Sequence, residues 1–130
     1  INVPGATGGW HTLSHHGEKP DLLKKLECIE RDILTNLNQF LSDLDQIPEG
    51  NGSLLDNTTV VIGSNFSDAS KHTCNNLPTI IAGGSYRHRA HSVVEKPTPL
   101  CNLFLDLLHH HDIDAGNFGS SKQPLGVLTA

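Results

Sequence analysis

The longest regular pattern of apolar residues in this chain lies between Asp21 and Leu44, and it has the period of a helix. The apolar residues recur at steps of three or four: Leu22, Leu26, Ile29, Ile33, Leu37, Phe40, Leu41 and Leu44. This spacing places them on one buried stripe of an α-helix, while most charged residues of the segment fall on the opposite face. The sequence therefore predicts an amphipathic helix that begins near Pro20 and ends before the loop residues 48–53.

Two shorter apolar runs predict β-strands. Residues 58–63 are β-branched and almost wholly apolar, and residues 77–82 are of the same kind. Such runs are typical of strands that are buried on both faces of a parallel sheet. A last helix is expected between Thr98, which would cap it, and His110, with Pro99 at its first position. The order helix, strand, strand, helix indicates an α/β fold.

This predicted sheet is too small for the helices beside it. Two or three strands would leave much of the apolar stripes facing water. We therefore expect the 130 residues to be one portion of a larger α/β domain with a mainly parallel sheet. The remainder of the parent protein, or another chain, would complete that sheet. The first residues, which lack an initiator Met and a signal-peptide pattern, are likewise expected of a fragment or a processed chain.

Composition and charge narrow the classes of partner. Lys and Arg total 9 and Asp and Glu total 14, which gives a net charge of -5 when every His is neutral. The chain lacks the positive excess on which nucleic-acid binding depends. No apolar run approaches the roughly 18 residues that a membrane-spanning helix needs. We therefore expect neither a nucleic-acid partner nor a transmembrane segment.

The three cysteines, Cys28, Cys74 and Cys101, are an odd number and lie far apart in the sequence. At least one of them stays unpaired unless it bonds to another chain. No zinc-ribbon spacing is present. We expect two buried thiols on helices and one thiol in a loop.

A glycine-rich segment, residues 8–17, contains three of the nine histidines. His11 and His15 are four residues apart, so on a helical turn their imidazoles would share a face and could bind one divalent ion. His16 is the third candidate ligand. The alternative is a surface loop whose histidines are solvated or hydrogen-bonded.

The loop after the first predicted strand, residues 64–76, is a second candidate region, because open α/β sheets place their sites at such strand ends. His72 is a candidate metal ligand and Asp68 a weaker one. The alternative is a capped turn in which Asp68 accepts hydrogen bonds from backbone N–H groups. Any metal bound by these side chains would be a divalent ion such as zinc, manganese or calcium.

Two further clusters carry other chemistry. Arg87 and Arg89 lie in a cationic loop and could bind a phosphate or sulfate group, because a guanidinium offers two parallel donors. A solvated loop is the alternative. The run His109 to His111 ends the last predicted helix, where cations complement the helix dipole. We expect these three histidines to have no chemical role.

Taken together, several segments resemble the C-terminal part of domain-of-unknown-function family 1552. They are residues 13–17, 47–58, 71–72, 76–78, 82–84, 98–100, 102–103 and 118–119. Members are longer, exported bacterial proteins with no established activity. The resemblance implies that residues 1–130 are a single C-terminal portion and that the protein is exported, to the periplasm or beyond. The family is distantly similar to the alkaline phosphatase and sulfatase superfamily, which implies a partial three-layer α/β/α sandwich and a two-metal centre.

The superfamily's site pattern fits this sequence incompletely. Its Asp-x-x-x-His pair would fall on His11 and His15, with His in place of Asp. Its Ser-Asp-His-Gly strand end is replaced, so that Asn65 and Phe66 stand where two metal ligands are expected, and His72 could substitute for one of them. No catalytic residue is assigned, because the usual nucleophile would lie outside this chain.

Three hypotheses about function follow. The first is a non-catalytic binding or structural module of an exported protein. The second is a metal-dependent hydrolase of phosphate or sulfate esters with a histidine-rich site. The third is a subunit of an extracellular assembly.

Overall fold

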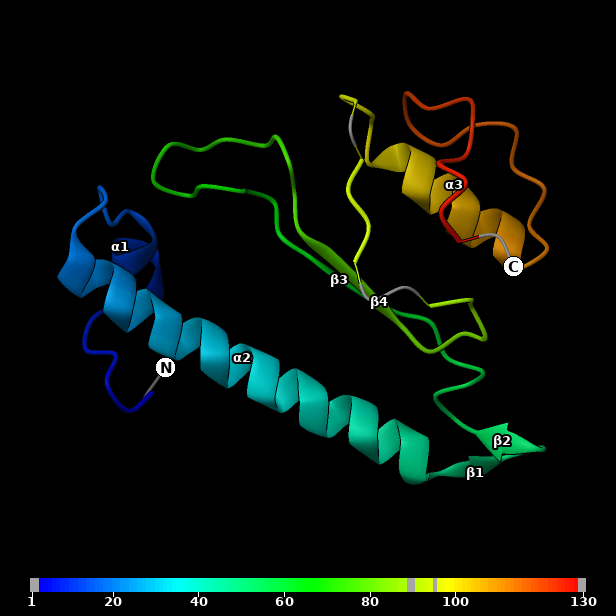
Figure 1. Cartoon of the computed structure of the whole chain (residues 1–130), viewed down its shortest axis with the longest axis horizontal. Helices are drawn as coiled ribbons and strands as arrows, with labels where there is room; N and C mark the ends of the chain where they lie inside the picture. Colours follow the sequence, from blue (N-terminus) through cyan, green and yellow to red (C-terminus); the bar gives the residue numbers. More distant parts are fainter. Residues whose placement is uncertain (1–2, 89–90, 95, 129–130) are drawn as a thin grey trace. The chain divides into compact units, whose positions relative to one another are not determined.

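A computed structural model describes residues 3–88, 91–94 and 96–128 (Figure 1). The chain divides into two compact units, Ile1–Gly84 and Ser85–Ala130, which we call unit 1 and unit 2. In unit 1 the elements are α1 (Trp10–Ser14), α2 (Pro20–Gln46), β1 (Pro48–Glu49), β2 (Gly52–Ser53), β3 (Val60–Gly63) and β4 (Thr79–Ala82). In unit 2 the helix is α3 (Cys101–His110). That residues 1–130 form one portion of a larger domain stays a prediction.

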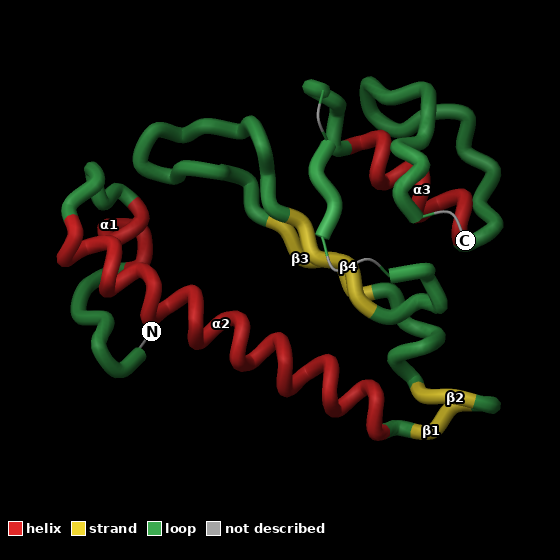
Figure 2. The backbone as a smooth tube through the Cα atoms, viewed as in Figure 1, coloured by secondary structure: helices red, strands yellow, loops and turns green. Residues whose placement is uncertain are grey.

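The long amphipathic helix is confirmed as α2, which dominates unit 1 (Figure 2). It has Pro20 in its first turn, where the missing N–H costs no hydrogen bond, and it ends just before the predicted loop. Its apolar stripe is buried at one end only. Ile29 is buried, whereas Ile33 and Phe40 are 40% and 49% exposed.

The core of unit 1 lies where α1 packs on the first half of α2. Val3, Leu13 and Ile29 are buried there. Leu22 and Leu26 pack against them from α2. The sequence did not predict α1, because the glycines around it are typical of a loop.

The strands exist where they were predicted, but their arrangement differs from the expected one. β3 pairs with β4 in antiparallel orientation, from Val60 opposite Ala82 to Gly63 opposite Thr79. β1 and β2 form a second antiparallel pair. The predicted mainly parallel sheet, and with it the partial α/β/α sandwich, is therefore wrong. A parallel neighbour needs a long crossover, usually a helix, and residues 64–78 between β3 and β4 contain none, so the chain returns alongside itself.

The β3–β4 pair is also less covered than its sequence predicts. Val61 is 39% exposed and Ile80 is 44% exposed. In the register of the pair these two side chains fall on opposite faces, so neither face is fully covered. The prediction of burial on both faces is wrong for these two residues.

Unit 2 is built around α3, on which the side chains of Leu103 and Leu105 are buried. Asp106 is also buried, at 6% exposure, and its carboxylate accepts hydrogen bonds from the backbone N–H groups of Gly126 and Val127 at 3.0 and 3.1 Å. These bonds hold the segment after α3 against the helix. Thr98 does not cap α3, because its hydroxyl donates to the Lys96 carbonyl instead.

All three cysteines are free thiols. Cys28 on α2 and Cys101 on α3 are half-buried, and Cys74 is exposed in the loop between β3 and β4. The predicted division into two helix thiols and one loop thiol is confirmed, although the helix thiols are not fully buried. None of the helices in residues 3–88, 91–94 and 96–128 is long and apolar enough to span a bilayer.

Candidate functional site

Three of the four candidate histidines meet at the α1 end of unit 1. The ring centroids of His11 and His15 lie 4.7 Å apart, and those of His15 and His72 lie 5.0 Å apart, both with edge-to-face geometry. The ring of Phe66 packs on His72 at 5.3 Å with 33° between the planes. We call His11, His15, His72 and Phe66 the imidazole cluster. It joins α1 to the loop of residues 64–78, and its side chains are exposed.

The short helix α1 explains why His11 and His15 lie together in this cluster. His11 lies within α1 and His15 follows directly after it, so the two imidazoles share one face, as the spacing of four predicts. His72 comes from a distant part of the chain and has a left-handed backbone with φ of 52°. That turn brings its ring to His15.

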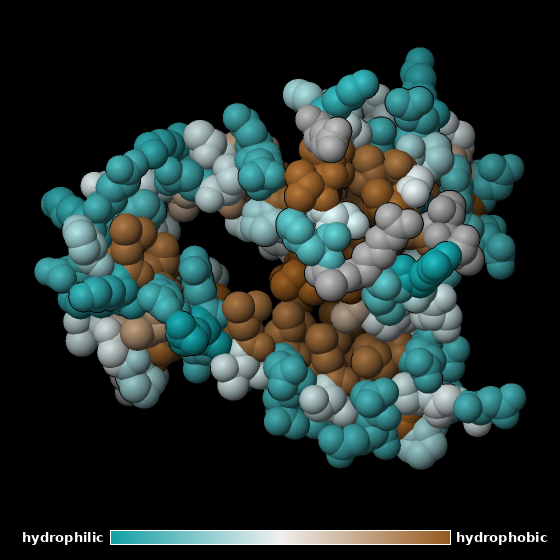
Figure 3. Space-filling model, viewed as in Figure 1, coloured by the Kyte–Doolittle hydropathy of each residue, from teal (hydrophilic) through white to brown (hydrophobic). Residues whose placement is uncertain are grey.

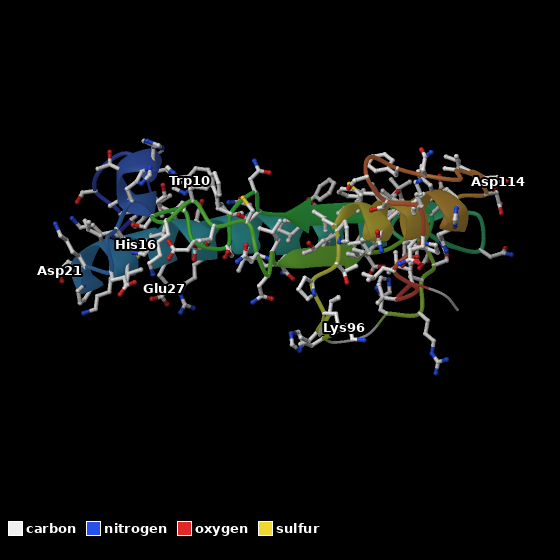
Figure 4. All side chains as sticks on the ribbon, turned by 90° about the horizontal axis from the view of Figure 1, so that it is seen from above. Trp10, His16, Asp21, Glu27, Lys96 and Asp114 are labelled. Atoms are coloured by element: carbon white, nitrogen blue, oxygen red, sulfur yellow. The ribbon has the colours of Figure 1, made fainter. Side chains whose placement is uncertain are left out.

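His16 lies close to the cluster in sequence but is used locally. Its Nδ1 accepts a hydrogen bond of 3.0 Å from the backbone N–H of Glu18. The lone pair of Nδ1 is therefore engaged, and the turn that leads into α2 is stabilised. Figure 4 shows His16 and Trp10 at this end of unit 1.

Asp68 forms the capped turn that was the alternative to metal binding. Its Oδ1 accepts hydrogen bonds from the backbone N–H groups of Ser70 and Lys71, at 2.9 and 3.1 Å. Its Oδ2 lies 3.2 Å from Lys71 Nζ. Both carboxylate oxygens are thus occupied by donors from the loop itself.

A second set of contacts ties this loop to the start of α2. Lys71 Nζ lies 2.5 Å from Glu18 Oε1, and Ser70 Oγ accepts a hydrogen bond of 3.0 Å from the backbone N–H of Gly17. The hydrogen bond and the charge of Lys71 lower the pKa of Glu18. Desolvation acts to raise the pKa of Asp68, but hydrogen bonds from Lys71 and Ser70 and the charge of Lys71 outweigh it, and that pKa is lowered too. The pKa of Lys71 is raised, first by its hydrogen bond to Glu18 and then by that to Asp68.

These shifts predict how the attachment of the loop depends on pH. Because the folded pKa values of Glu18 and Asp68 lie below their unfolded values, their contribution is present above about pH 4 and is lost as the pH falls through the folded values. Replacing Lys71 with Met should raise the pKa of Glu18 towards its ordinary value, which a carboxyl NMR titration measures. Arg31→Met is the matched control, since Arg31 forms its ion pair with Glu27 on α2, away from Glu18. An unchanged Glu18 titration in Lys71→Met would contradict this account.

The described side chains, as they are placed, do not form a three-ligand metal centre. A structural or catalytic zinc ion takes three or four protein ligands at about 2.0–2.3 Å. In the part of the chain that the structure describes, no three His, Cys, Asp or Glu side chains are placed to hold one ion. The assignment of His11, His15, His16, His72 and Asp68 as metal ligands stays a prediction.

Of the two candidate anion-binding residues, Arg87 is exposed. Arg89 lies outside the described residues. The anion site therefore stays a prediction.

The three histidines at the end of α3 have packing roles that the sequence analysis missed. The ring of His110 stacks on the buried Tyr86, with centroids 3.8 Å apart. His111 Nε2 lies 3.5 Å from the Tyr86 hydroxyl, and His109 Nε2 lies 2.9 Å from the carbonyl oxygen of Ala115. No local sequence pattern links Tyr86 to this histidine run, because the contact joins distant parts of the chain.

Unit 2 also has an open cavity of about 300 Å³ that the sequence analysis did not identify. His109, Asp112, Ile113 and Asp114 line it. The signal that could have found it is a pair of carboxylates directly after a histidine run.

Comparisons of the chain with protein-family models, with curated proteins and with solved structures find no match. The resemblance to family 1552 therefore depends on the sequence segments alone, and family membership and export stay predictions.

Proposed function

We propose that this chain is a non-catalytic binding or structural module of an exported bacterial protein that resembles the alkaline phosphatases and sulfatases. The observation that carries the proposal is the contact between Phe66 and His72. Phe66 occupies the position at which the resemblance expects a metal ligand, and its ring packs on His72 at 5.3 Å. A phenyl ring offers no ligand atom, so this contact supports packing as the role of the loop.

The hydrogen bonds around the cluster support the same conclusion. His16 and Asp68 accept hydrogen bonds from backbone N–H groups, which leaves His11, His15 and His72 in contact through their rings. Edge-to-face ring contacts stabilise packing without a bound ion. In this function the imidazole cluster fastens the loop to α1.

One observation favours the alternative function, a metal-dependent hydrolase of phosphate or sulfate esters. His15 and His72 are far apart in sequence, yet their rings lie 5.0 Å apart. Imidazole nitrogens are good ligands for zinc and related ions. In that function the rings of His11, His15 and His72 would have to turn to bring their nitrogens onto one ion, and the nucleophile would come from another part of the parent protein.

Metal content and hydrolysis separate the two functions. The purified chain is expected to retain less than one equivalent of zinc, manganese or calcium by mass spectrometry. It is also expected to hydrolyse neither p-nitrophenyl phosphate nor p-nitrophenyl sulfate when these ions are added. Stoichiometric metal that is lost in His15→Ala/His72→Ala, but kept in the control His91→Ala/His109→Ala, would overturn the non-catalytic proposal.

The exposed β3–β4 pair supports a partner that adds strands. Among the described residues, β3 and β4 pair only with each other, so each has an open edge. An exposed edge presents unpaired N–H and C=O groups, which favour pairing with a further strand. The remainder of the parent protein, or another chain of an extracellular assembly, would supply it.

A further inference from the structure

Charge is distributed unequally along α2 and beyond it. Between residues 19 and 31 basic and acidic residues alternate: Lys19, Asp21, Lys24, Lys25, Glu27, Glu30 and Arg31. From residue 32 to residue 70 there is no Lys, Arg or His, and the charged residues are Asp32, Asp43, Asp45, Glu49, Asp56 and Asp68. The second half of α2 is therefore purely acidic.

The apolar stripe of α2 is open in that same half. Its first part is covered, because α1 and Val3 pack on Ile29 and its neighbours. Its second part continues with Ile33, Leu37, Phe40 and Leu44: Ile33 and Phe40 are 40% and 49% exposed, and Leu37 and Leu44 are half-buried. Figure 3 shows apolar atoms at the surface along α2, among hydrophilic ones. We call Ile33, Leu37, Phe40 and Leu44, with Asp32 and Asp43, the α2 face.

The two aspartates flank this stripe on one side. They are eleven residues apart, which is close to three full helical turns, so their side chains point in nearly the same direction. Both carboxylates are exposed, and each accepts a hydrogen bond from a side chain four residues away on the helix: Asp32 from Asn36, and Asp43 from Gln39. Neither pairs with a cation in the described residues.

The negative charge of Asp32 and Asp43 indicates which kind of partner can bind the α2 face. In an antiparallel pair, a second copy of the chain would bring Asp32 and Asp43 of one helix beside the same residues of the other. In a parallel pair these carboxylates would face the other flank of the partner helix, which carries no cation in this half. A nucleic acid or an anionic lipid surface would also present negative charge. A partner with Lys or Arg beside an apolar stripe complements both the charge and the apolar contact.

We propose that the α2 face docks a basic amphipathic helix of a partner protein. The inference rests on the proposed function as a binding module, and it names the partner's chemistry. Apolar side chains of the partner, spaced three and four apart, lie against Ile33, Leu37 and Phe40, while its flanking Lys or Arg residues lie beside Asp32 and Asp43. Because Asp32 and Asp43 are exposed, their attraction to the partner's cations is screened by salt, so binding depends on salt concentration.

The test uses the full 130-residue chain and two synthetic helical peptides of 18 residues. One carries Leu at i, i+3, i+4 and i+7 with Lys elsewhere, and the other has Glu in place of every Lys. The Leu/Lys peptide is expected to shift the backbone NMR resonances of residues 32–46 saturably, and the Leu/Glu peptide is expected to leave them in place. Raising the salt from 50 to 500 mM should weaken the binding about tenfold, because exposed charges are screened at that concentration.

Variants locate the contact. Phe40→Glu should weaken binding of the Leu/Lys peptide at least tenfold, since it places a charge in the apolar stripe. Leu23→Glu is the matched control, because Leu23 is likewise exposed on α2, at 40% against 49% for Phe40, but lies in the first half of the helix. Asp32→Lys/Asp43→Lys should reverse the preference, so that the Leu/Glu peptide becomes the tighter ligand.

Several results would overturn this assignment. The first is equal binding of the two peptides, and the second is resonance shifts outside residues 32–46. The third is a dimer in analytical ultracentrifugation that Phe40→Glu dissociates, which would mean that the α2 face binds a second copy of the chain. Binding to phosphatidylglycerol vesicles through the same residues would give it to a membrane. Failure of the proposed function is distinct, because a metal-dependent hydrolase would be found by its metal and its activity while the peptide results stayed unchanged.

Discussion

Gly83→Ala is expected to destabilise unit 1 by at least about 3 kcal/mol. Gly83 has φ of +70°, and the left-handed conformation costs an alanine about 1–2 kcal/mol. A Cβ at this position would also clash with the carbonyl oxygens of Thr58 and Leu55, which are backbone atoms and cannot rotate away. The neighbouring Gly84 N–H donates to the same Leu55 carbonyl at 3.0 Å, so relief of the clash would break that bond.

Thermal unfolding followed by circular dichroism measures this effect. For a unit of this size, 3 kcal/mol corresponds to a fall in Tm of roughly 12–24 °C. Gly50→Ala separates the two causes, because Gly50 also has positive φ, at +59°, but no atom lies within 4 Å of the added Cβ. We expect Gly50→Ala to cost only the conformational part. Equal losses in the two variants would mean that the clash is relieved by movement of the backbone.

The second large effect is expected at Asp106 in unit 2. This side chain is 6% exposed, and each of its carboxylate oxygens accepts one backbone N–H, from Gly126 and from Val127. Asp106→Asn replaces one acceptor with an amide N–H₂ that faces a donor, which should cost about 1–3 kcal/mol. Asp106→Ala leaves both N–H groups without the carboxylate and should cost more.

Hydrogen exchange of single amides identifies the cause. The amides of Gly126 and Val127 should lose protection in Asp106→Asn, while the amide of Leu125, which donates to the Asn102 carbonyl, should change less. Asp112→Asn on the same unit is the control, since Asp112 is exposed. If protection at both amides were unchanged in Asp106→Asn, the carboxylate would not hold this segment.

The sequence predicted those elements whose signal is local. The apolar period of residues 21–44 identified α2 because the period of a helix is set by the chain itself. The β-branched runs identified β3 and β4 as strands, but the direction of pairing depends on the path of residues 64–78, and no local pattern encodes that path. The parallel sheet was inferred from burial that the strands do not have.

In the candidate site, too, the sequence predicted the local contacts and did not predict the contacts between distant residues. The spacing of His11 and His15 predicted a shared face, and the structure adds His72 from a distant loop. His16 and Asp68 carry the right atoms for a metal site, but short-range backbone donors reach them first. Sequence spacing indicates which side chains could face one another. It does not show whether a backbone N–H group in the same turn already donates a hydrogen bond to the atom that would bind a metal.

Asp106 could not be recognised from the sequence. A carboxylate in the middle of a helix is usually solvated, so the pattern gave no reason to place it inside. Its partners are N–H groups twenty and twenty-one residues further along the chain, which is a tertiary contact.

The length of α2 makes it a rigid spacer between the two places to which we assign a role. Its 27 residues correspond to about 40 Å of helix, with the imidazole cluster near its first turn and the α2 face on its second half. A reporter group at the first turn of α2 would therefore make no direct contact with a ligand bound to the α2 face. Any response transmitted between them would have to pass along the helix as a change in its bending or orientation, which distance measurements between two labels on α2 would detect.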